Sequence, residues 1–386
     1  MKKLSFLSIF FVFLIGCQDD SEIVIPVVPE KVFYSPEKMI IGSDLSFVNQ
    51  LEDNGAVYKD SSVVKDPYAI FKSKGANVIR VRLWHNPTWT GNYNGGMLYS
   101  NLADVTKTIR RSKEAGMQVC LDIHYSDSWA DPSKQTVPQA WQGLNHFILG
   151  DSVYQYTRAT LDYLQTQELV PEFVQIGNET NQGMLWPAGK VVNNDWIGFA
   201  ELVQKGIQAV RDFSSTSTIK PQIILHVAQM KHAEYYTNGL TSAGVTDFDI
   251  IGISHYYQYA DGMTMSTVTS TIQGLKNTYD KKIMIMETSY PWTSDFADNY
   301  SNLLSGNEGF ANYGVSIAAQ RKYMIDLTQA VIAGGGSGIF YWEPAWISTA
   351  MKDQYGTGSP YENETLFNFV GNATSGFDYM TWKYNF

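Results

Sequence analysis

Residues 78–84 read VIRVRLW, residues 101–115 read NLADVTKTIRRSKEA, and residues 118–124 read QVCLDIH. The first and third segments are short apolar runs with β-branched residues, which is typical of parallel strands covered on both faces. The segment between them repeats apolar residues at the spacing of an amphipathic helix. Gly116 follows where such a helix should stop. The three segments therefore predict one strand–helix–strand unit.

This unit recurs along the whole chain. The predicted strands are Met39–Leu45, Val78–Leu83, Gln118–His124, Phe173–Gly177, Gln222–Val227, Ile250–His255, Ile283–Glu287 and Ile339–Trp342, and the clearest helical stretches are Asn101–Ala115, Val153–Gln167, Trp196–Phe213 and Ile317–Ala333. Eight such runs in 386 residues predict an α/β fold, a single (β/α)8 barrel. An open, doubly wound sheet is the alternative, but no glycine-rich phosphate motif follows the first run.

The N-terminus has the features of an export signal. Lys2 and Lys3 precede the apolar run Leu4–Ile15, which is too short for a comfortable membrane span. The run ends in Leu-Ile-Gly-Cys, which resembles a bacterial lipobox, so residues 1–16 are expected to be a lipoprotein signal peptide, with Cys17 lipidated. An ordinary signal peptide that happens to contain a cysteine is the alternative.

The next residues predict how the protein is attached. Residues 18–22 are acidic and resemble a tag that sends some lipoproteins to the outer surface. Residues 18–36 contain three prolines and are expected to form a tether, so that 37–386 is the catalytic barrel. We therefore expect a protein exported and lipid-anchored to the bacterial outer membrane, facing outward, with no other membrane contact. Cys120 has no expected disulfide partner and is predicted to be a small buried residue.

The composition of the chain limits the classes of molecule that it is expected to bind. The formal net charge is −10 and no basic stretch is present, which argues against nucleic acid. Ten Trp and 24 Tyr residues are more than a core usually needs. Aromatic faces suit the apolar faces of sugars, although a tyrosine-rich core would also explain the count.

A barrel of this kind carries its chemistry at the C-terminal ends of its strands. The predicted runs end in polar or aromatic residues at nearly every position, which packing alone does not explain. These ends are Asp44, Arg82 with Trp84, Asp122 with His124, Asn178 with Glu179, His255 with Tyr256 and Tyr257, Glu287, and Trp342 with Glu343.

Glu179 and Glu287 end the fourth and seventh runs. An ionised carboxylate at the end of an apolar strand is costly unless it is paired, so a salt bridge to a strand arginine is the structural alternative. Two carboxyls about 5–5.5 Å apart across a glycosidic bond give hydrolysis with retention. Arg80 and Arg82 alternate with Val81 and Leu83, so both should face the lumen, where one can reach Glu287.

These residues match a known family. Asn178-Glu179 with Glu287 is the signature of clan A glycoside hydrolases, and the chain closely resembles family 53, the arabinogalactan endo-β-1,4-galactanases. The matching segments are 42–46 (GSDLS), 80–84 (RVRLW), 121–132 (LDIHYSDSWADP), 175–179 (QIGNE), 287–292 (ETSYPW) and 341–346 (YWEPAW). The resemblance implies endo-acting, retaining hydrolysis of β-1,4-galactan, without a cofactor in the chemistry.

The resemblance also implies roles for single residues. Glu179 would be the acid/base and Glu287 the nucleophile; Asn178 would bind the 2-hydroxyl of the sugar, and Arg80 would hold Glu287 ionised. The substrate-binding residues implied are Trp84, Asp122, His124, Asp131, Lys134, His255, Tyr257, Trp292, Trp342 and Trp346, with Tyr257 also near the nucleophile. A monomer is expected.

A structural calcium ion is implied less directly, since some bacterial members hold one between the loops after the seventh and eighth strands. The candidate ligands here are Asp295, Asp298, Asn299, Ser359 and Glu362, which offer the hard oxygen atoms that calcium prefers. Solvated loop acids are the alternative.

Two other functions remain open from the sequence. Another clan A endo-glycanase, a mannanase or a xylanase, would have the same barrel and the same pair of glutamates. A non-catalytic glycan-binding surface lipoprotein is the third hypothesis, although binding alone does not require both glutamates.

Overall fold

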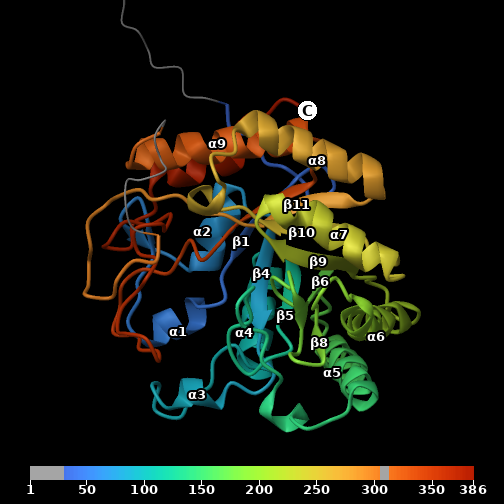
Figure 1. Cartoon of the computed structure of the whole chain (residues 1–386). Coiled ribbons are helices and arrows are strands. Elements are labelled where there is room, and N and C mark those ends of the chain that lie inside the picture. Colours follow the sequence, from blue (N-terminus) through green and yellow to red (C-terminus); the bar gives the residue numbers. More distant parts are fainter. Residues whose placement is uncertain (1–29, 305–312) are drawn as a thin grey trace, which may run out of the picture.

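The computed structural model describes residues 30–304 and 313–386, and a closed barrel of parallel strands forms its centre (Figure 1). Because β1 pairs with both β4 and β12, the sheet has no edge. The (β/α)8 prediction is confirmed, and the open sheet is excluded. The barrel strands are β1 (Ile40–Asp44), β4 (Val78–Leu83), β5 (Gln118–Ile123), β6 (Phe173–Ile176), β9 (Gln222–Ala228), β10 (Ile250–Ser254), β11 (Lys282–Glu287) and β12 (Gly338–Tyr341).

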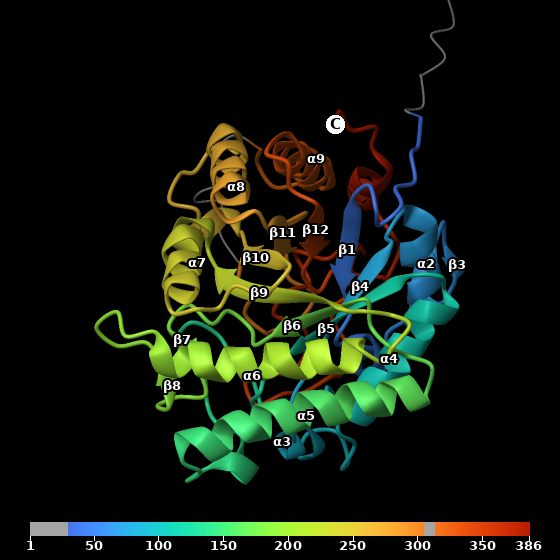
Figure 2. The same ribbon diagram turned by 90° about the vertical axis from the view of Figure 1, so that its right-hand side faces the viewer.

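Helices cover the outside of the barrel, and Figure 2 shows α5 and α6 side by side across one flank. The α-helices are α1 (Val48–Asp53), α2 (Pro67–Lys74), α3 (Thr88–Gly91), α4 (Leu102–Glu114), α5 (His146–Thr166), α6 (Ile197–Ser214), α7 (Ala233–Ser242), α8 (Met265–Tyr279) and α9 (Ile317–Ala333). After β12, the described residues 342–386 contain no α-helix, and the 3-10 helix η4 (Ser375–Thr381) packs there against α9 and α2.

Short elements decorate the loops. They are the hairpins β2 (Lys59–Asp60) with β3 (Val63–Val64) and β7 (Gly183–Met184) with β8 (Gly189–Lys190), and the 3-10 helices η1 (Gln139–Trp141), η2 (Met230–His232) and η3 (Tyr257–Tyr259).

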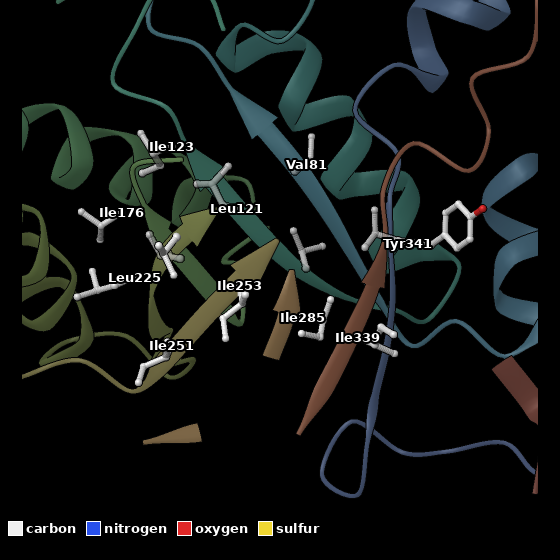
Figure 3. Close-up of a cluster of buried hydrophobic side chains, with 14 of the residues drawn as sticks. Val81, Leu121, Ile123, Ile176, Leu225, Ile251, Ile253, Ile285, Ile339 and Tyr341 are labelled. Carbon is white, nitrogen blue, oxygen red and sulfur yellow. The ribbon is translucent and has the colours of Figure 1, made fainter. Parts of the chain in front are cut away.

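Side chains alternate between the two faces of each barrel strand, and they form one apolar layer outside the barrel and another inside it. Outward side chains such as Val81, Ile285 and Tyr341 pack beneath the helices, as Figure 3 shows. Inward side chains fill the lower lumen, where a Cβ on Gly42 would lie 2.2 Å from the ring of Phe340. The lumen layer consists of Ile40, Val78, Cys120, Phe173, Ile224, Ile250, Met284, Met286 and Phe340. Cys120 is buried and free, as expected.

The chain joins the barrel earlier than residue 37. The Val32 N–H donates to the carbonyl of Thr381 across 2.8 Å, and the buried Tyr34 hydroxyl donates to the carbonyl of Trp382. A tether would therefore end before these residues. The signal peptide, Cys17 and residues 18–29 lie outside the described part. Within residues 30–304 and 313–386, no helix is both long and apolar enough to cross a bilayer.

Candidate active site

A cleft with a volume of about 290 Å³ opens at the C-terminal ends of the barrel strands, where the barrel was expected to carry its chemistry. Charged groups lie at its floor and aromatic rings on its walls. The lining residues are Asp44, Arg80, Arg82, Asp122, His124, Trp129, Ala130, Asp131, Pro132, Asn178, Glu179, Ala228, Gln229, Ser254, Tyr256, Tyr259, Glu287, Leu304, Trp342 and Tyr361.

Glu179 reaches the cleft through an unusual turn after β6. Gly177 has φ +75°, and a Cβ there would lie 2.7 Å from Thr180. Glu179 itself has φ +46°, in the left-handed region that non-glycine residues rarely adopt. Backbone strain of this kind clusters at functional sites. The turn places the Glu179 carboxyl in the cleft rather than along the strand direction.

Glu287 reaches the cleft through a break in strand register. Ile283 and Ile285 point outward into the helix-covered core, so strict alternation would also turn Glu287 outward. The pairing of β10 with β11 shifts after Ile253, and this shift sets Glu287 opposite Ser254 at the cleft. Glu287 is only 6% exposed.

The two glutamates face one another across the floor. A carboxyl oxygen of Glu179 lies within 4.8 Å of one of Glu287. Arg80 Nη1 donates to Glu287 Oε1 at 2.8 Å, and the Tyr256 hydroxyl donates to Oε2 at 3.0 Å. Glu287 therefore accepts hydrogen bonds from two donors, which favour its ionised form.

Arg80 is the centre of the floor and is itself 1% exposed. Its Nη1 also donates to Asp44 at 3.1 Å, and its Nη2 donates to Asp122 at 2.8 Å and to the side-chain oxygen of Asn178 at 2.9 Å. The Asn178 Nδ2 group donates to the carbonyl of Ala130 at 2.9 Å, which fixes the orientation of the amide.

Burial and the negative charge of Glu287 raise the pKa of Glu179 to about 8, against the opposing hydrogen bond from Ser254. Burial also raises the pKa of Glu287, but the Arg80 guanidinium opposes this. Two carboxyls this close share one proton near neutrality. The ion pair and the tyrosine hydroxyl on Glu287 assign that proton to Glu179.

A family model described as glycosyl hydrolase family 53 matches residues 40–380. The chain belongs to glycosyl hydrolase family 53. The resemblance seen in the motifs is therefore confirmed.

Two curated relatives are similar over most of their length. An arabinogalactan endo-β-1,4-galactanase of Cellvibrio japonicus is 41% identical over 85% of this chain and 86% of its own. An endo-β-1,4-galactanase of Bacillus subtilis is 33% identical over 89% of this chain and 85% of its own.

Solved structures agree with this family 53 membership. The family 53 catalytic domain of Ignisphaera aggregans is 34% identical, with a TM-score of 0.83 over 93% of this chain and 100% of that domain. A structure of fungal β-1,4-galactanases is 29% identical, with a TM-score of 0.75 over 89% of this chain and 99% of the other. A xylanase of Caldicellulosiruptor owensensis is 12% identical, with a TM-score of 0.54 over 89% of this chain and 97% of its own, and shares the fold alone.

The family 53 cleft brings together most of the residues expected from the sequence. Those that line it are Arg80, Asp122, His124, Asp131, Asn178, Glu179, Glu287 and Trp342. Trp84 lies behind the wall, where its Nε1 donates to His124 Nδ1 at 3.3 Å. The other predicted contacts, Lys134, His255, Tyr257, Trp292 and Trp346, are not in the lining.

These five residues have other surroundings. Lys134 pairs its backbone with Asp131, and His255 lines a small neighbouring cavity. Tyr257 packs on Tyr323 of α9. Trp292 packs on Phe369, and Trp346 packs against Phe47 in a tilted arrangement with 4.0 Å between ring centroids. The rings of Tyr257, Trp292 and Trp346 are therefore used in packing.

The tyrosine whose hydroxyl donates to Glu287, the expected nucleophile, is Tyr256. Ser254 lines the cleft, so alternation brings Tyr256 to the same side and turns Tyr257 toward the helices. Sequence reasoning also missed Trp129 and Tyr361 in the cleft wall and the buried His226 beneath it. Trp129 stood inside the family motif, and His226 stood two residues beyond Ile224 on an inward-facing row.

The structure assembles only part of the predicted calcium site. Asp298, Ser359 and Glu362 converge: the Ser359 N–H donates to Asp298 at 2.8 Å, and the Ala297 N–H donates to Glu362 at 2.7 Å. Asp295 and Asn299 are exposed. Burial is the main cause that raises the pKa of Glu362 to about 7. Three of the five candidate ligands therefore lie close together, and calcium binding by these loops stays a prediction.

Glu179, His226 and Glu287 offer three ligand atoms within 4.8 Å of one another, the one such group in residues 30–304 and 313–386. Both His226 nitrogens already form hydrogen bonds, at 2.9 Å to Asn178 and 3.0 Å to Ser254. The Arg80 guanidinium already neutralises Glu287. The group therefore fits a proton-transfer site better than a metal site.

Proposed function

We propose that this family 53 member is an endo-β-1,4-galactanase that hydrolyses plant (arabino)galactan with retention of configuration. The observation that carries the proposal is the pair of facing carboxyls, one held ionised by Arg80 and the other held protonated by burial. An oxygen–oxygen approach within 4.8 Å fits the shorter carboxyl spacing of retaining enzymes, about 5–5.5 Å, and not the 6.5–9.5 Å of inverting ones. The galactan specificity rests on the family and on its galactanase relatives.

In this mechanism, Glu287 attacks the anomeric carbon while Glu179 gives its proton to the departing glycosidic oxygen. Water then hydrolyses the glycosyl-enzyme, and Glu179 takes a proton from that water. Asn178 would bind the sugar 2-hydroxyl, a contact that strengthens in the transition state. The half-buried Trp129 and the Trp342 ring offer stacking faces for galactosyl units.

The experiment compares wild-type protein on β-1,4-galactan, mannan and xylan, with Glu179→Ala and Glu287→Ala in parallel. We expect rapid loss of galactan chain length by wild type and a fall of at least about a thousandfold in either variant. Cleavage of mannan or xylan with galactan left intact would favour another clan A activity. Binding without any cleavage would favour a glycan-binding protein.

The remaining proposals concern location and assembly. We propose export, lipidation of Cys17, attachment to the outer membrane and a monomeric state. Calcium binding by the loops after β11 and β12 also stays an expectation from the resemblance. Mass spectrometry of the mature N-terminus would show a diacylated Cys17, or a free N-terminus if an ordinary signal peptide is removed.

A further inference from the structure

We propose that the Ser254 hydroxyl hydrogen turns between Glu179 and His226 as Glu179 loses and regains its proton during catalysis. His226 would be a positioning residue that gives this hydroxyl its second acceptor. The inference deepens the proposed function and rests on it, because only a double-displacement cycle needs Glu179 first as an acid and then as a base.

The distances define a chain of three hydrogen bonds. Ser254 Oγ lies 2.6 Å from Glu179 Oε1 and 3.0 Å from His226 Nε2. His226 Nδ1 lies 2.9 Å from the side-chain oxygen of Asn178. His226 is fully buried, and Ser254 is 2% exposed, so water does not readily replace these partners.

The side-chain oxygen of Asn178, the nearest partner of His226 Nδ1, indicates the histidine tautomer. The Asn178 oxygen accepts from Arg80 Nη2 and its nitrogen donates to the Ala130 carbonyl, so the atom facing His226 is an acceptor. At 2.9 Å this oxygen is the nearest partner of Nδ1, nearer than Gln175 Nε2 at 3.2 Å and the Glu179 N–H at 3.4 Å. Gln175 Nε2 also donates to Asp122 at 2.6 Å and to the Gly177 carbonyl at 3.0 Å, so the proposal assigns the His226 hydrogen to Nδ1. Burial lowers the pKa of His226 well below its usual value, so the ring is neutral. Nε2 of a neutral Nδ1–H ring is a bare acceptor.

One hydroxyl hydrogen thus has two acceptors. When Glu179 is protonated, its O–H can donate to Ser254 Oγ, and Ser254 then donates to His226 Nε2. When Glu179 is ionised, the Ser254 hydroxyl turns and donates to the carboxylate. No covalent bond at Ser254 or His226 changes, because the hydrogen only rotates about the Cβ–Oγ bond. Ser254 therefore offers a partner to both protonation states of the acid/base.

Other charged groups act on Glu179 and on His226, which lie on either side of Ser254. Glu287 and Asp131 face Glu179 with negative charge, and Arg80 faces it with positive charge. Around His226, Arg80 and His124 oppose a positive ring, and Asp122 favours one. None of these groups contributes a second acceptor to Ser254, so the two variants below separate the hydroxyl from its charged surroundings.

The test is the alkaline limb of the kcat/KM profile on galactan. Ser254→Ala removes the donor that favours ionised Glu179, so the limb should move to higher pH. His226→Leu removes the competing acceptor, so Ser254 donates to Glu179 alone and the limb should move to lower pH. A hydrogen bond of about 1 kcal/mol corresponds to roughly 0.7 pH unit in each direction.

His226→Gln supplies the conservative rescue. Its side-chain oxygen can accept from Ser254, so the limb should return toward the wild-type position even though the donor to Asn178 is lost. Folding is followed by circular dichroism, and if His226→Leu does not fold, the comparison of Ser254→Ala with His226→Gln and 15N NMR of histidine-labelled wild type remain. The spectra should show His226 as the neutral Nδ1–H tautomer, identified by its loss in His226→Gln.

If His226→Leu folds, limb shifts in opposite directions for Ser254→Ala and His226→Leu support the proposal. If it does not fold, the Nδ1–H tautomer together with a limb moved to higher pH in Ser254→Ala supports it. Shifts in the same direction, no shift, or an Nε2–H or charged His226 overturn it. If wild-type protein does not cleave galactan at all, the proposed function has failed instead, and the tautomer measurement still reports on the chain of hydrogen bonds.

Discussion

Nη1 of Arg80 donates to Oε1 of Glu287 at 2.8 Å, and the same guanidinium reaches Asp44, Asp122 and Asn178. This arrangement makes one buried cation the common partner of Glu287, the proposed nucleophile, and of the amide expected to bind the sugar 2-hydroxyl. The cation explains how two buried glutamates can hold different protonation states in one cleft.

Arg80→Lys should therefore lower kcat and shift the pH dependence of activity. A single ammonium cannot replace the planar fork, so kcat should fall roughly a hundredfold or more. Weaker pairing leaves the pKa of Glu287 raised by burial, so the acidic limb of the activity profile should move to higher pH. Arg111→Lys, on α4 and paired with Glu52 and Asp66, is the matched control and should leave the limb in place.

Tyr256→Phe should lower kcat about ten- to a hundredfold, because Glu287 loses a donor at 3.0 Å. The acidic limb should also move to higher pH, since the lost hydrogen bond favours the ionised carboxylate. The neighbouring variant Tyr257→Phe is the control. A larger kcat loss in Tyr257→Phe than in Tyr256→Phe would contradict the assignment made from strand alternation.

Trp129→Ala should raise KM roughly tenfold on galactan, the loss of about 1.4 kcal/mol of stacking, with a smaller effect on kcat. The Arg82 guanidinium lies 4.2 Å from the Trp129 ring centroid and holds the ring in the cleft wall. Trp292→Ala is the comparison, because Trp292 packs on Phe369 outside the lining. Initial rates over a range of galactan concentrations measure both; an equal KM rise in the two variants would contradict the placement.

Glu364 is 1% exposed, and burial raises its pKa to about 8. The folded state keeps this proton while the unfolded state loses it near the usual 4.5, so stability falls as pH rises from about 4.5 to 8. A tenfold change in proton affinity is about 1.4 kcal/mol, so the total is several kcal/mol.

Glu364→Gln should flatten this dependence. Chemical denaturation at pH 5 and pH 8 should show a smaller loss of unfolding free energy in the variant than in wild type. Glu114→Gln, on the exposed face of α4, should behave as wild type. A variant that loses as much stability as wild type between the two pH values would show that Glu364 is ionised in the folded protein.

The sequence predicted the barrel well because its signal is periodic and local. Each apolar run overlaps a strand. Arg80 and Arg82 could be placed in the lumen because they alternate with Val81, which points outward. The start of α5 was less clear: the helix begins at His146, and Asn145 caps it by accepting from the Ile148 N–H. The apolar pattern becomes regular only further along.

The cleft was harder to predict where the backbone departs from regular geometry. The register shift beside Ser254 turns Glu287 inward, and the spacing of residues in the sequence does not predict this shift. The tryptophans were a different problem, since Trp346 and Trp129 both occur in family motifs. The Trp346 ring packs against Phe47 and the Trp129 ring lines the cleft, and only tertiary packing distinguishes the two.

The central claim is that Glu287 forms a covalent glycosyl-enzyme and Glu179 serves as acid and then base on β-1,4-galactan. Proton NMR of the first seconds of galactan hydrolysis by wild-type protein tests it most directly. With retention, new reducing ends should appear first as the β-anomer and only later equilibrate with the α-anomer. First appearance of the α-anomer, or no new reducing ends from galactan, would contradict it.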